Sequence, residues 1–350
     1  MEATYKKYIL EFKDPSGTSR GILTWKESWF LILRQDANIG IGECGILRGL
    51  SIDDVPGYED KLKWTCANIH LGKEALWEAL TDFPSIQFGL EQAFLSLNSP
   101  DPFLLFPSPF TDGDRTIPIN GLVWMGNEKF MHQQIEKKLA QGFKCIKMKI
   151  GAIDFEKEIA LLASIRTEYG EDEIELRVDA NGAFPYSRAL DKLNRLAPYA
   201  IHSIEQPIKA GQVLEMKDLC ERSPIPIALD EELIGIAQVT DKEELLQTIN
   251  PQYIILKPSL IGGIKGSAQW ISVAERLNIK WWITSALESN IGLNAIAQWT
   301  FTLQNKLPQG LGTGSLYTNN FESPLTVRDG QIGYVKSKDW QQNLIETICI

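Results

Sequence analysis

Lysines and carboxylates recur where short apolar runs end in the second half of the chain. The stretch FKCIKMKIGA at 143–152 holds three lysines, and two of them, Lys147 and Lys149, are two positions apart. The charged residues of such runs are Lys147, Lys149, Asp179, Glu205, Asp230 and Lys257. Carboxylates can bind a metal ion, and a lysine amine can accept a proton when it is uncharged. Together these residue types suit the metal-assisted removal of a proton next to a carboxylate.

The lysine pair has two interpretations. On a β-strand, alternate side chains point the same way, so Lys147 and Lys149 share one face with Cys145. Lysines are also common on edge strands, where they protect a sheet from pairing with other chains. If the pair instead faces a site with a divalent cation, the neighbouring positive charges lower the pKa of Lys149 and favour its neutral, basic form.

The three acids also have two interpretations. Each one alone fits a helix-capping acid at the start of a loop. On neighbouring strands, Asp179, Glu205 and Asp230 would repel one another unless a cation lay between them. Oxygen ligands without histidine or cysteine predict Mg²⁺, with Mn²⁺ as a substitute. Lys257 would face this ion from across the site, and the plain alternative is a strand-end lysine whose amine extends to solvent.

The spacing of these residues predicts the elements that position them. Intervals of 25 to 27 residues, enough for one strand and one helix, separate successive members of the series Asp179, Glu205, Asp230 and Lys257. Eight short apolar runs recur at 117–124, 145–150, 174–180, 201–207, 225–231, 253–258, 281–286 and 310–315. This α/β alternation favours a (β/α)7–8 TIM-like barrel, whose active sites lie at the carboxyl ends of the strands. A doubly wound open sheet is the alternative.

The segments on either side of the barrel predict a capping domain. Residues 1–112 contain hairpin-like strands, the helical stretch PSIQFGLEQAFLSL and a proline-rich connector. The tail at 322–350 has an Asp-Gly turn between two strand-like runs, which predicts a hairpin outside the βα rhythm. We therefore expect an α+β capping domain formed by 1–112 and completed by 322–350, with the barrel catalytic domain at 113–321.

Composition limits the partners. A formal charge of −10 and a pI near 5.0 give a field that repels nucleic acid and anionic membranes. No apolar stretch has the length of a membrane span. Five cysteines without a CxxC pair fit free thiols in a reducing compartment. We expect a cytoplasmic protein with a small-molecule carboxylate substrate, and the sequence leaves its oligomeric state open.

As a set, these motifs resemble the enolase superfamily, in the order found in its muconate-lactonising subgroup. The KMK run at 147–149 matches the KxK motif of the second barrel strand, and the DAN run at 179–181 matches the DxN motif of the third. The resemblance extends over nearly the whole chain. It implies a Mg²⁺ site whose ligands are Asp179, Glu205 and Asp230.

Within the subgroup, four segments look like those of enzymes that dehydrate a cyclohexadiene carboxylate in menaquinone biosynthesis by way of an enediolate. They are GTSRGILTWKESWFLIL, GECGILRGLS, LKPSLIGG and SALESNIGL. The resemblance implies that Lys149 removes the proton alpha to the carboxylate and returns it to the leaving hydroxyl on the same face. Lys257 would stabilise charge from the other face, Lys147 would orient the site, and Asn181 would support it.

The resemblance also implies contacts with the substrate. Ser285 and Ser289 would touch it directly. Arg20, in a cap loop at 19–21, would pair with the second carboxylate of the substrate, and its plain alternative is a surface hairpin arginine. The glycine-rich run GLGTGS at 310–315 suits a close approach of the backbone to a carboxylate, with a phosphate-binding loop as the alternative.

Two rival functions stay open. An N-acylamino acid racemase or a dipeptide epimerase on the same scaffold would use Lys149 and Lys257 as opposed base and acid. Dipeptide epimerases usually have a KxDxxGG pattern at the sixth barrel strand. This chain has KPSLIGG at 257–263 and lacks the aspartate. A barrel that binds a metal or a metabolite without catalysis is the more remote alternative, and the complete set of lysines and acids speaks against it.

Overall fold

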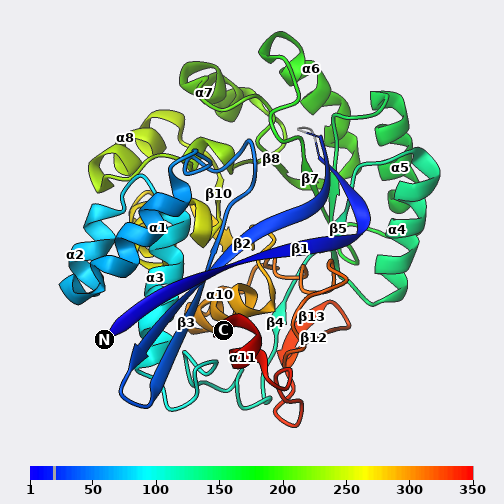
Figure 1. The fold of residues 1–350 in the computed structure, drawn as a ribbon. Coiled ribbons are helices and arrows are strands. Elements are labelled where there is room, and N and C mark those ends of the chain that lie inside the picture. Colours follow the sequence, from blue (N-terminus) through cyan, green and yellow to red (C-terminus); the bar gives the residue numbers. More distant parts are fainter. Residues whose placement is uncertain (19–20, 350) are drawn as a thin grey trace.

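The chain folds into a barrel with a separate sheet and helices laid against it (Figure 1). The computed structural model describes residues 1–18 and 21–349. The N-terminal elements, which we call the cap, are β1 Glu2–Thr18, β2 Gly21–Gln35, β3 Asn38–Gly45, α1 Tyr58–Ala67, α2 Gly72–Ala79 and α3 Pro84–Leu97. None of the helices in the described ranges combines the length and the apolar composition that a bilayer crossing requires.

Strands and helices then alternate. The strands are β4 Ile117–Pro118, β5 Gly121–Val123, β6 Cys145–Lys149, β7 Glu175–Asp179, β8 Ile201–Glu205, β9 Ile227–Leu229, β10 Tyr253–Leu256 and β11 Lys280–Ile283. The helices are α4 Glu128–Ala140, α5 Phe155–Glu168, α6 Tyr186–Leu196, α7 Val213–Arg222, α8 Val239–Ile249, α9 Gly263–Arg276 and α10 Asn290–Thr302. Figure 1 shows helices α4 to α8 around the outside of the strands.

The parallel sheet runs from β5 to β11 in sequence order and closes into a barrel. In the described chain two residues complete the closure: Gln309 bridges to Ile119 on one side and Gly310 bridges to Thr284 on the other, both in the parallel sense. The predicted barrel fold is confirmed. The eighth apolar run, expected at 310–315, gives this short bridge instead of a full strand, and no helix lies between α10 and β12 in the described chain.

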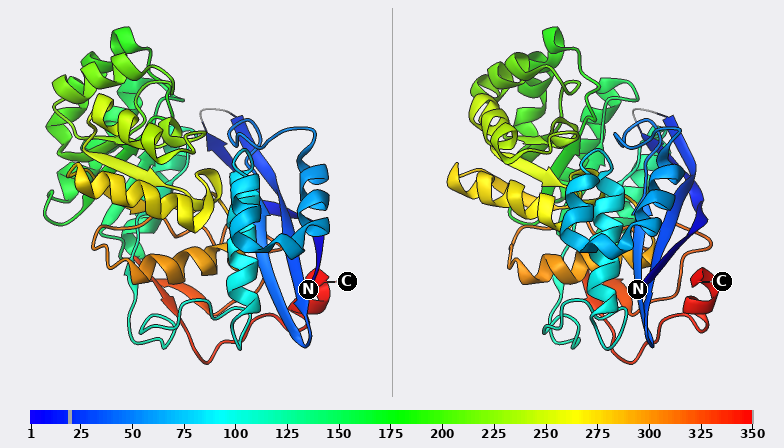
Figure 2. Two further views of the ribbon diagram at one scale, coloured as in Figure 1. Left: turned by 90° about the vertical axis from the view of Figure 1, so that its left-hand side faces the viewer. Right: turned by 60° about the vertical axis from the view of Figure 1, so that its left-hand side comes forward.

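The cap is a second layer beside the barrel (Figure 2). Its strands form an antiparallel sheet in the order β1-β2-β3, and the predicted helix at 84–97 is α3, which packs on β3. The packing is close because glycines meet there. A side chain on Gly42 would place its Cβ 1.8 Å from the carbonyl oxygen of Gly89. The two elements therefore touch backbone to backbone.

Two buried glutamates of the cap bind the first turns of barrel helices. Glu43 of β3 accepts hydrogen bonds from the backbone N–H groups of Ser289 and Gly292 at the start of α10, both at 2.9 Å. Glu91 of α3 accepts from the N–H of Lys265 at 3.0 Å, in the first turn of α9. A carboxylate at a helix N-terminus is favoured by the helix dipole as well as by the free N–H groups. These contacts fix the cap over the barrel.

The C-terminal tail contacts both parts of the molecule. Strands β12 Leu325–Arg328 and β13 Gln331–Tyr334 form the predicted hairpin around Asp329 and Gly330, and β13 pairs with β4 rather than with the sheet of the cap. The last helix, α11 Leu344–Cys349, lies against β1, where Lys6 Nζ donates to the carbonyl oxygen of Thr347 at 2.9 Å. The division into domains at 112–113 and 321–322 stays a prediction.

The substitution Gly42→Ala should destabilise the protein strongly. The added methyl group has no space between β3 and α3, so we expect the free energy of unfolding to fall by about 3 kcal/mol, as measured by urea denaturation. Gly170→Ala is the matched control because its Cβ would meet nothing closer than Glu173 Oε2 at 3.7 Å. Equal effects of the two substitutions would contradict the close contact.

Candidate active site

The charged residues singled out from the sequence lie together at the carboxyl end of the barrel. Around the ring they are Lys147 and Lys149 on β6, Asp179 on β7, Glu205 on β8, Asp230 directly after β9 and Lys257 directly after β10. In the strand register Lys149 pairs with Asp179, and Asp179 pairs with Glu205, so their side chains start at one level. All of these residues except Lys257 are buried, and the Lys257 side chain is only 13% exposed.

On the β6 to β8 side, ammonium and carboxylate groups alternate. Lys149 Nζ donates to Asp179 Oδ2 at 2.8 Å, and Lys147 Nζ lies 3.1 Å from the same oxygen. Lys147 also donates to Glu205 Oε2 at 2.5 Å. Burial lowers the pKa of Lys147, but Glu205 and then Asp179 raise it above its ordinary value. Burial raises the pKa of Asp179, whereas the lysines, Lys149 first, hold it well below its usual range.

On the β8 to β10 side, acids outnumber lysines. Lys257 pairs with Asp230, and its Nζ lies 3.7 Å from Glu205 Oε1. Burial raises the pKa of Asp230, Lys257 lowers it, and the adjacent carboxylates Glu231 and Glu205 leave it well above its usual value. Burial lowers the pKa of Lys257, and Asp230 with Glu205 raises it overall. Negative charge therefore accumulates between Glu205 and Asp230.

The carboxylate oxygens of the three acids are donors that a hard divalent cation prefers, although lysines lie among them. Within residues 1–18 and 21–349, no three His, Cys, Asp or Glu side chains are grouped closely enough to hold a metal ion. Glu205 Oε1, however, is buried and has no hydrogen-bond partner. A buried carboxylate oxygen that accepts no hydrogen bond and lies next to a second acid is the kind of donor that Mg²⁺ takes. The residue types fit the ion, and the ammonium groups of Lys147 and Lys257 contact the carboxylates of the three acids.

A cavity of about 130 Å³, partly open to solvent, adjoins this cluster. Its floor carries five of the polar residues expected at the site, namely Lys147, Lys149, Asp179, Asn181 and Lys257. Its walls are largely apolar and come from the cap, through Leu23, Leu47 and Leu50, and from the barrel, through Leu122, Trp124, Ala286, Leu287 and Leu316. Charged groups on one side and apolar walls elsewhere suit a small organic anion.

Asn181 links the two halves of the charged cluster. Its backbone is in the left-handed region, with φ at 43°, and its Oδ1 accepts from Lys149 Nζ at 2.6 Å. Its Nδ2 donates to Glu231 Oε1 at 3.0 Å. Gln206, directly after Glu205, also has a positive φ, 40°. Such backbone strain is held only where the surroundings fix it, and it recurs at functional sites.

Of the other residues predicted to contact the substrate, one lines the cavity, one does not, and one lies outside the described residues. Ser285 lines the cavity, with its Oγ 2.6 Å from Thr313 Oγ1. Ser289 does not line the cavity, because its Oγ donates to Glu43 at 2.5 Å and caps α10. Arg20 lies outside the described residues. Sequence reasoning missed the leucines of the cap and Trp124, since apolar side chains after a strand carry no signal of chemistry.

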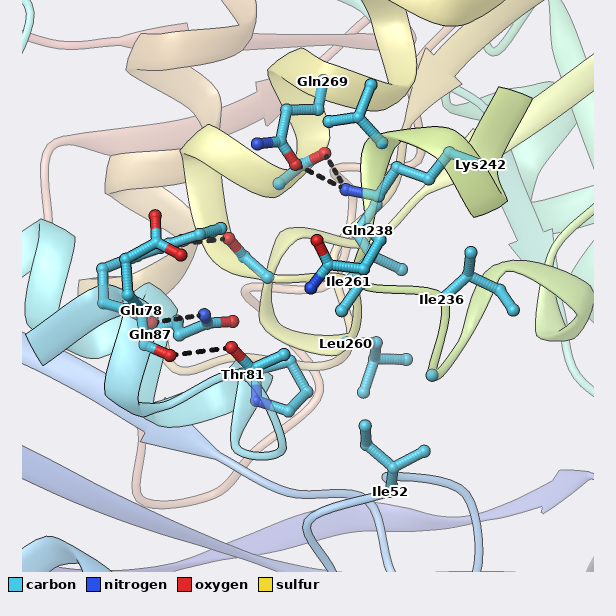
Figure 3. Close-up of a pocket in the computed structure, with 17 residues that line it drawn as sticks. Ile52, Glu78, Thr81, Gln87, Ile236, Gln238, Lys242, Leu260, Ile261 and Gln269 are labelled. Atoms are coloured by element: carbon cyan, nitrogen blue, oxygen red, sulfur yellow. Dashed lines mark hydrogen bonds between the residues drawn. The ribbon is translucent and has the colours of Figure 1, made fainter. Parts of the chain in front are cut away.

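A second cavity lies between the cap and the loops that follow β9 and β10 (Figure 3). Lys242 is buried there, and its Nζ donates to Gln269 Oε1 at 2.7 Å and to the carbonyl oxygen of Gly266 at 3.3 Å. Burial lowers the pKa of Lys242 to about 8. The two cavities share no lining residue, and none of the clustered lysines and acids reaches the second one. The cluster of lysines and acids therefore adjoins the first cavity and not the second.

Comparison with known proteins identifies the class. The family model described as enolase C-terminal domain-like matches residues 131–336, more than half of the chain. The chain belongs to this family, and its capped barrel is the fold of the enolase superfamily. The o-succinylbenzoate synthase of Desulfotalea psychrophila is 46% identical over 95% of this chain and 99% of the relative. The crystal structure of MenC from the same organism has a TM-score of 0.84 at 44% identity and covers 95% of this chain and 99% of its own.

Epimerases are more distant. The L-Ala-D/L-Glu epimerase of Bacillus subtilis is 27% identical over 54% of this chain and 51% of the relative. Its substrate-liganded structure has a TM-score of 0.78 at 20% identity, with 97% of each chain covered, which is a likeness of fold. The predicted enolase-superfamily membership and the prediction of a hydro-lyase of the o-succinylbenzoate synthase type are thus confirmed.

Replacing Lys242 with methionine should stabilise the protein in a pH-dependent way. The folded-state pKa of about 8 is below the ordinary 10.5, so the buried charge is unfavourable below pH 8, and this cost disappears as the pH rises to 10.5. We expect urea denaturation to show a gain of about 2 kcal/mol at pH 7 that shrinks towards pH 10. Lys306→Met, at an exposed position, should show no such trend. A gain that is constant with pH would contradict the effect of burial.

Proposed function

We propose that the chain catalyses the magnesium-dependent syn-dehydration of 2-succinyl-6-hydroxy-2,4-cyclohexadiene-1-carboxylate to 2-succinylbenzoate, a step of menaquinone biosynthesis. The observation that carries this proposal is the 46% identity with an o-succinylbenzoate synthase over 99% of that protein. The cavity supports it, because buried lysines and apolar walls surround a space suited to a cyclic carboxylate.

The two lysines proposed for catalysis approach the cavity from opposite sides. Lys149 is on β6 and Lys257 follows β10, with β7, β8 and β9 between them in the sheet. In the proposed reaction the neutral amine of Lys149 takes the proton on the carbon alpha to the carboxylate. It then gives this proton to the hydroxyl group, which leaves as water from the same face, while the electron pair of the broken C–H bond completes the aromatic ring.

The acids and the remaining lysines prepare this proton transfer. We infer that Asp179, Glu205 and Asp230 hold Mg²⁺, with Mn²⁺ as a substitute. When bound, the ion would supply positive charge that stabilises the negative charge developing on the substrate carboxylate. Lys257 provides a fixed positive charge on the face opposite Lys149. Lys147, bonded to Glu205, keeps that acid oriented.

We assign separate parts to the four residues proposed for substrate binding. Asn181 and Ser285 line the cavity, which supports direct contact with substrate. Ser289 supports the site indirectly, because its hydrogen bond to Glu43 holds the segment that carries Ser285 and Leu287. Arg20 is proposed as a partner of the second carboxylate from the sequence alone.

We also infer a cytoplasmic location. Cys44, Cys66, Cys145 and Cys220 are free thiols in the described chain, which suits a reducing compartment. The reaction itself needs no partner other than its small-molecule substrate and the ion.

The substitution Lys149→Ala should abolish most of the dehydration. Loss of the proposed base removes a general acid–base contribution, so we expect kcat to fall about 10³-fold in an absorbance assay of aromatic product formation. Lys144→Ala, at an exposed lysine of the same stretch, is the control and should keep full activity. A chelator should stop the wild type, and added Mg²⁺ or Mn²⁺ should restore it. Full turnover by the Lys149 variant would refute the assigned role.

The racemase alternative has its own test. The opposed lysines would also suit exchange of an alpha proton, so wild-type enzyme is mixed with an N-succinylamino acid in heavy water and followed by NMR. We expect no alpha-deuteration on the time scale of dehydration, because the relative that is 46% identical to this chain is named an o-succinylbenzoate synthase. The missing aspartate of KPSLIGG disfavours dipeptide epimerisation and leaves racemisation of N-acylamino acids open. Rapid deuteration with racemisation would move the proposal to the racemase.

A further inference from the structure

The second cavity, between the cap and the loops after β9 and β10, is larger than the cavity beside the clustered lysines and acids. Its volume is about 210 Å³, against about 130 Å³ for the first. At about 30 Å³ for each molecule, it has room for roughly seven waters. A ligand of about six non-hydrogen atoms would therefore fit in it.

Lys242 of α8 brings a buried positive charge to this cavity without an acid to balance it. The residue is only 1% exposed. Its ammonium group has three N–H donors and two acceptors, Gln269 Oε1 at 2.7 Å and the carbonyl oxygen of Gly266 at 3.3 Å. Within residues 1–18 and 21–349, no carboxylate lies within ion-pair distance of this amine. In the described chain one of its donors is thus left for a ligand.

The acid that shares this cavity and the acid next to Lys242 in the chain have other partners. Glu78 lines the cavity, but it is exposed and pairs with Lys265 at 2.8 Å. Glu243 pairs with Arg276 of α9 at 3.1 Å. Burial is the cause that lowers the pKa of Lys242 to about 8. The negative group of a ligand would offset this cost of burial.

The rest of the cavity is largely apolar, and its walls are held in place by hydrogen bonds. Trp77 Nε1 of the cap donates to the carbonyl oxygen of Gly262 at 3.2 Å, and Gln87 Nε2 donates to the carbonyl oxygen of Trp77 at 2.8 Å. Figure 3 shows the Lys242 amine with Gln269 on one side of the cavity and Ile52 on the opposite side. The apolar lining residues include Ile52, Trp77, Ile236, Leu260 and Ile261. A charged group at one end of an apolar space suits a small organic acid.

We propose that this cavity is a second ligand site, which binds a short-chain monocarboxylate through Lys242. The carboxylate accepts from the free donor of the ammonium group, and the hydrocarbon chain lies against the apolar walls. The inference goes beyond the proposed function, since none of the clustered lysines and acids lines this cavity. The ligand would touch Trp77 of the cap together with Ile236 and Leu260 of the barrel loops. Its binding would therefore hold the cap and the barrel together.

Binding calorimetry in the presence of EDTA tests the site, with butyrate as the probe and butyramide as its neutral analogue. We expect butyrate to bind the wild type with a Kd of about 1 mM, since it has so few atoms, and butyramide to bind about tenfold more weakly. Lys242→Met should weaken the binding of butyrate about tenfold, as for the loss of one charge-assisted hydrogen bond, and should leave butyramide unchanged.

The uptake of protons gives a second readout. At pH 8 about half of the Lys242 side chains are neutral, and a bound carboxylate favours the charged form. We therefore expect the wild type to take up about half a proton for each butyrate bound at pH 8, measured from the binding heats in two buffers of different ionisation enthalpy. The Lys242→Met variant should take up none.

Three further variants locate the binding. Ile236→Trp fills the cavity but keeps Lys242, so it should weaken butyrate binding at least as much as Lys242→Met does. Lys149→Ala changes only the first cavity, and Lys306→Met changes an exposed residue, so both should keep the affinity of the wild type. Thermal melting of each variant shows that its fold is intact.

Several outcomes would overturn the second site. They are an unchanged affinity of the Lys242→Met variant for butyrate, equal binding of butyrate and butyramide by the wild type, or a loss produced by Lys149→Ala and not by Lys242→Met. No measurable binding of butyrate to the wild type would also exclude the site, even if the enzyme dehydrates its precursor. Binding through Lys242 by a protein that forms no aromatic product would instead contradict the proposed function and support the second site.

Discussion

The alternation of buried ammonium and carboxylate groups at the barrel rim is the constraint on which the site depends. An isolated charge in such a place is costly, and only close partners of opposite sign make the cluster tolerable. Strand geometry supplies them, since Lys147 and Lys149 share one face of β6 while Ile146 and Met148 fill the core on the other. The same alternation leaves Glu205 and Asp230 with excess negative charge, which is where a cation would be stabilised.

The sequence predicts this arrangement well where periodicity and chemistry coincide. The regular intervals from Asp179 to Lys257 indicate one strand and one helix per step, because each repeat must cross the barrel and return. Parallel strands then bring their carboxyl ends to one rim, so residues far apart in the chain converge. The cap helix at 84–97 follows from a single apolar stripe, and the tail hairpin follows from its Asp-Gly turn.

Other features depend on tertiary contacts that no local pattern encodes. The eighth run is rich in glycine, and Gln309 and Gly310 form short bridges there in place of a full strand. Gly310 lies so close to Thr284 that an added Cβ would be 2.4 Å from Thr284 Oγ1. The sequence does not show that the hydroxyl group of Ser289 donates a hydrogen bond to Glu43 and not to a ligand.

The carboxylates of Glu43 and Glu91 hold the cap through main-chain N–H groups and not through particular side chains of α9 and α10. Every residue type except proline provides such a donor. Most substitutions in the first turns of those helices would therefore leave these hydrogen bonds intact. A scaffold attached in this way can exchange the residues that face its ligand, on the cap or on the barrel, while the two parts keep their alignment, so new specificities can evolve on it without a new interface.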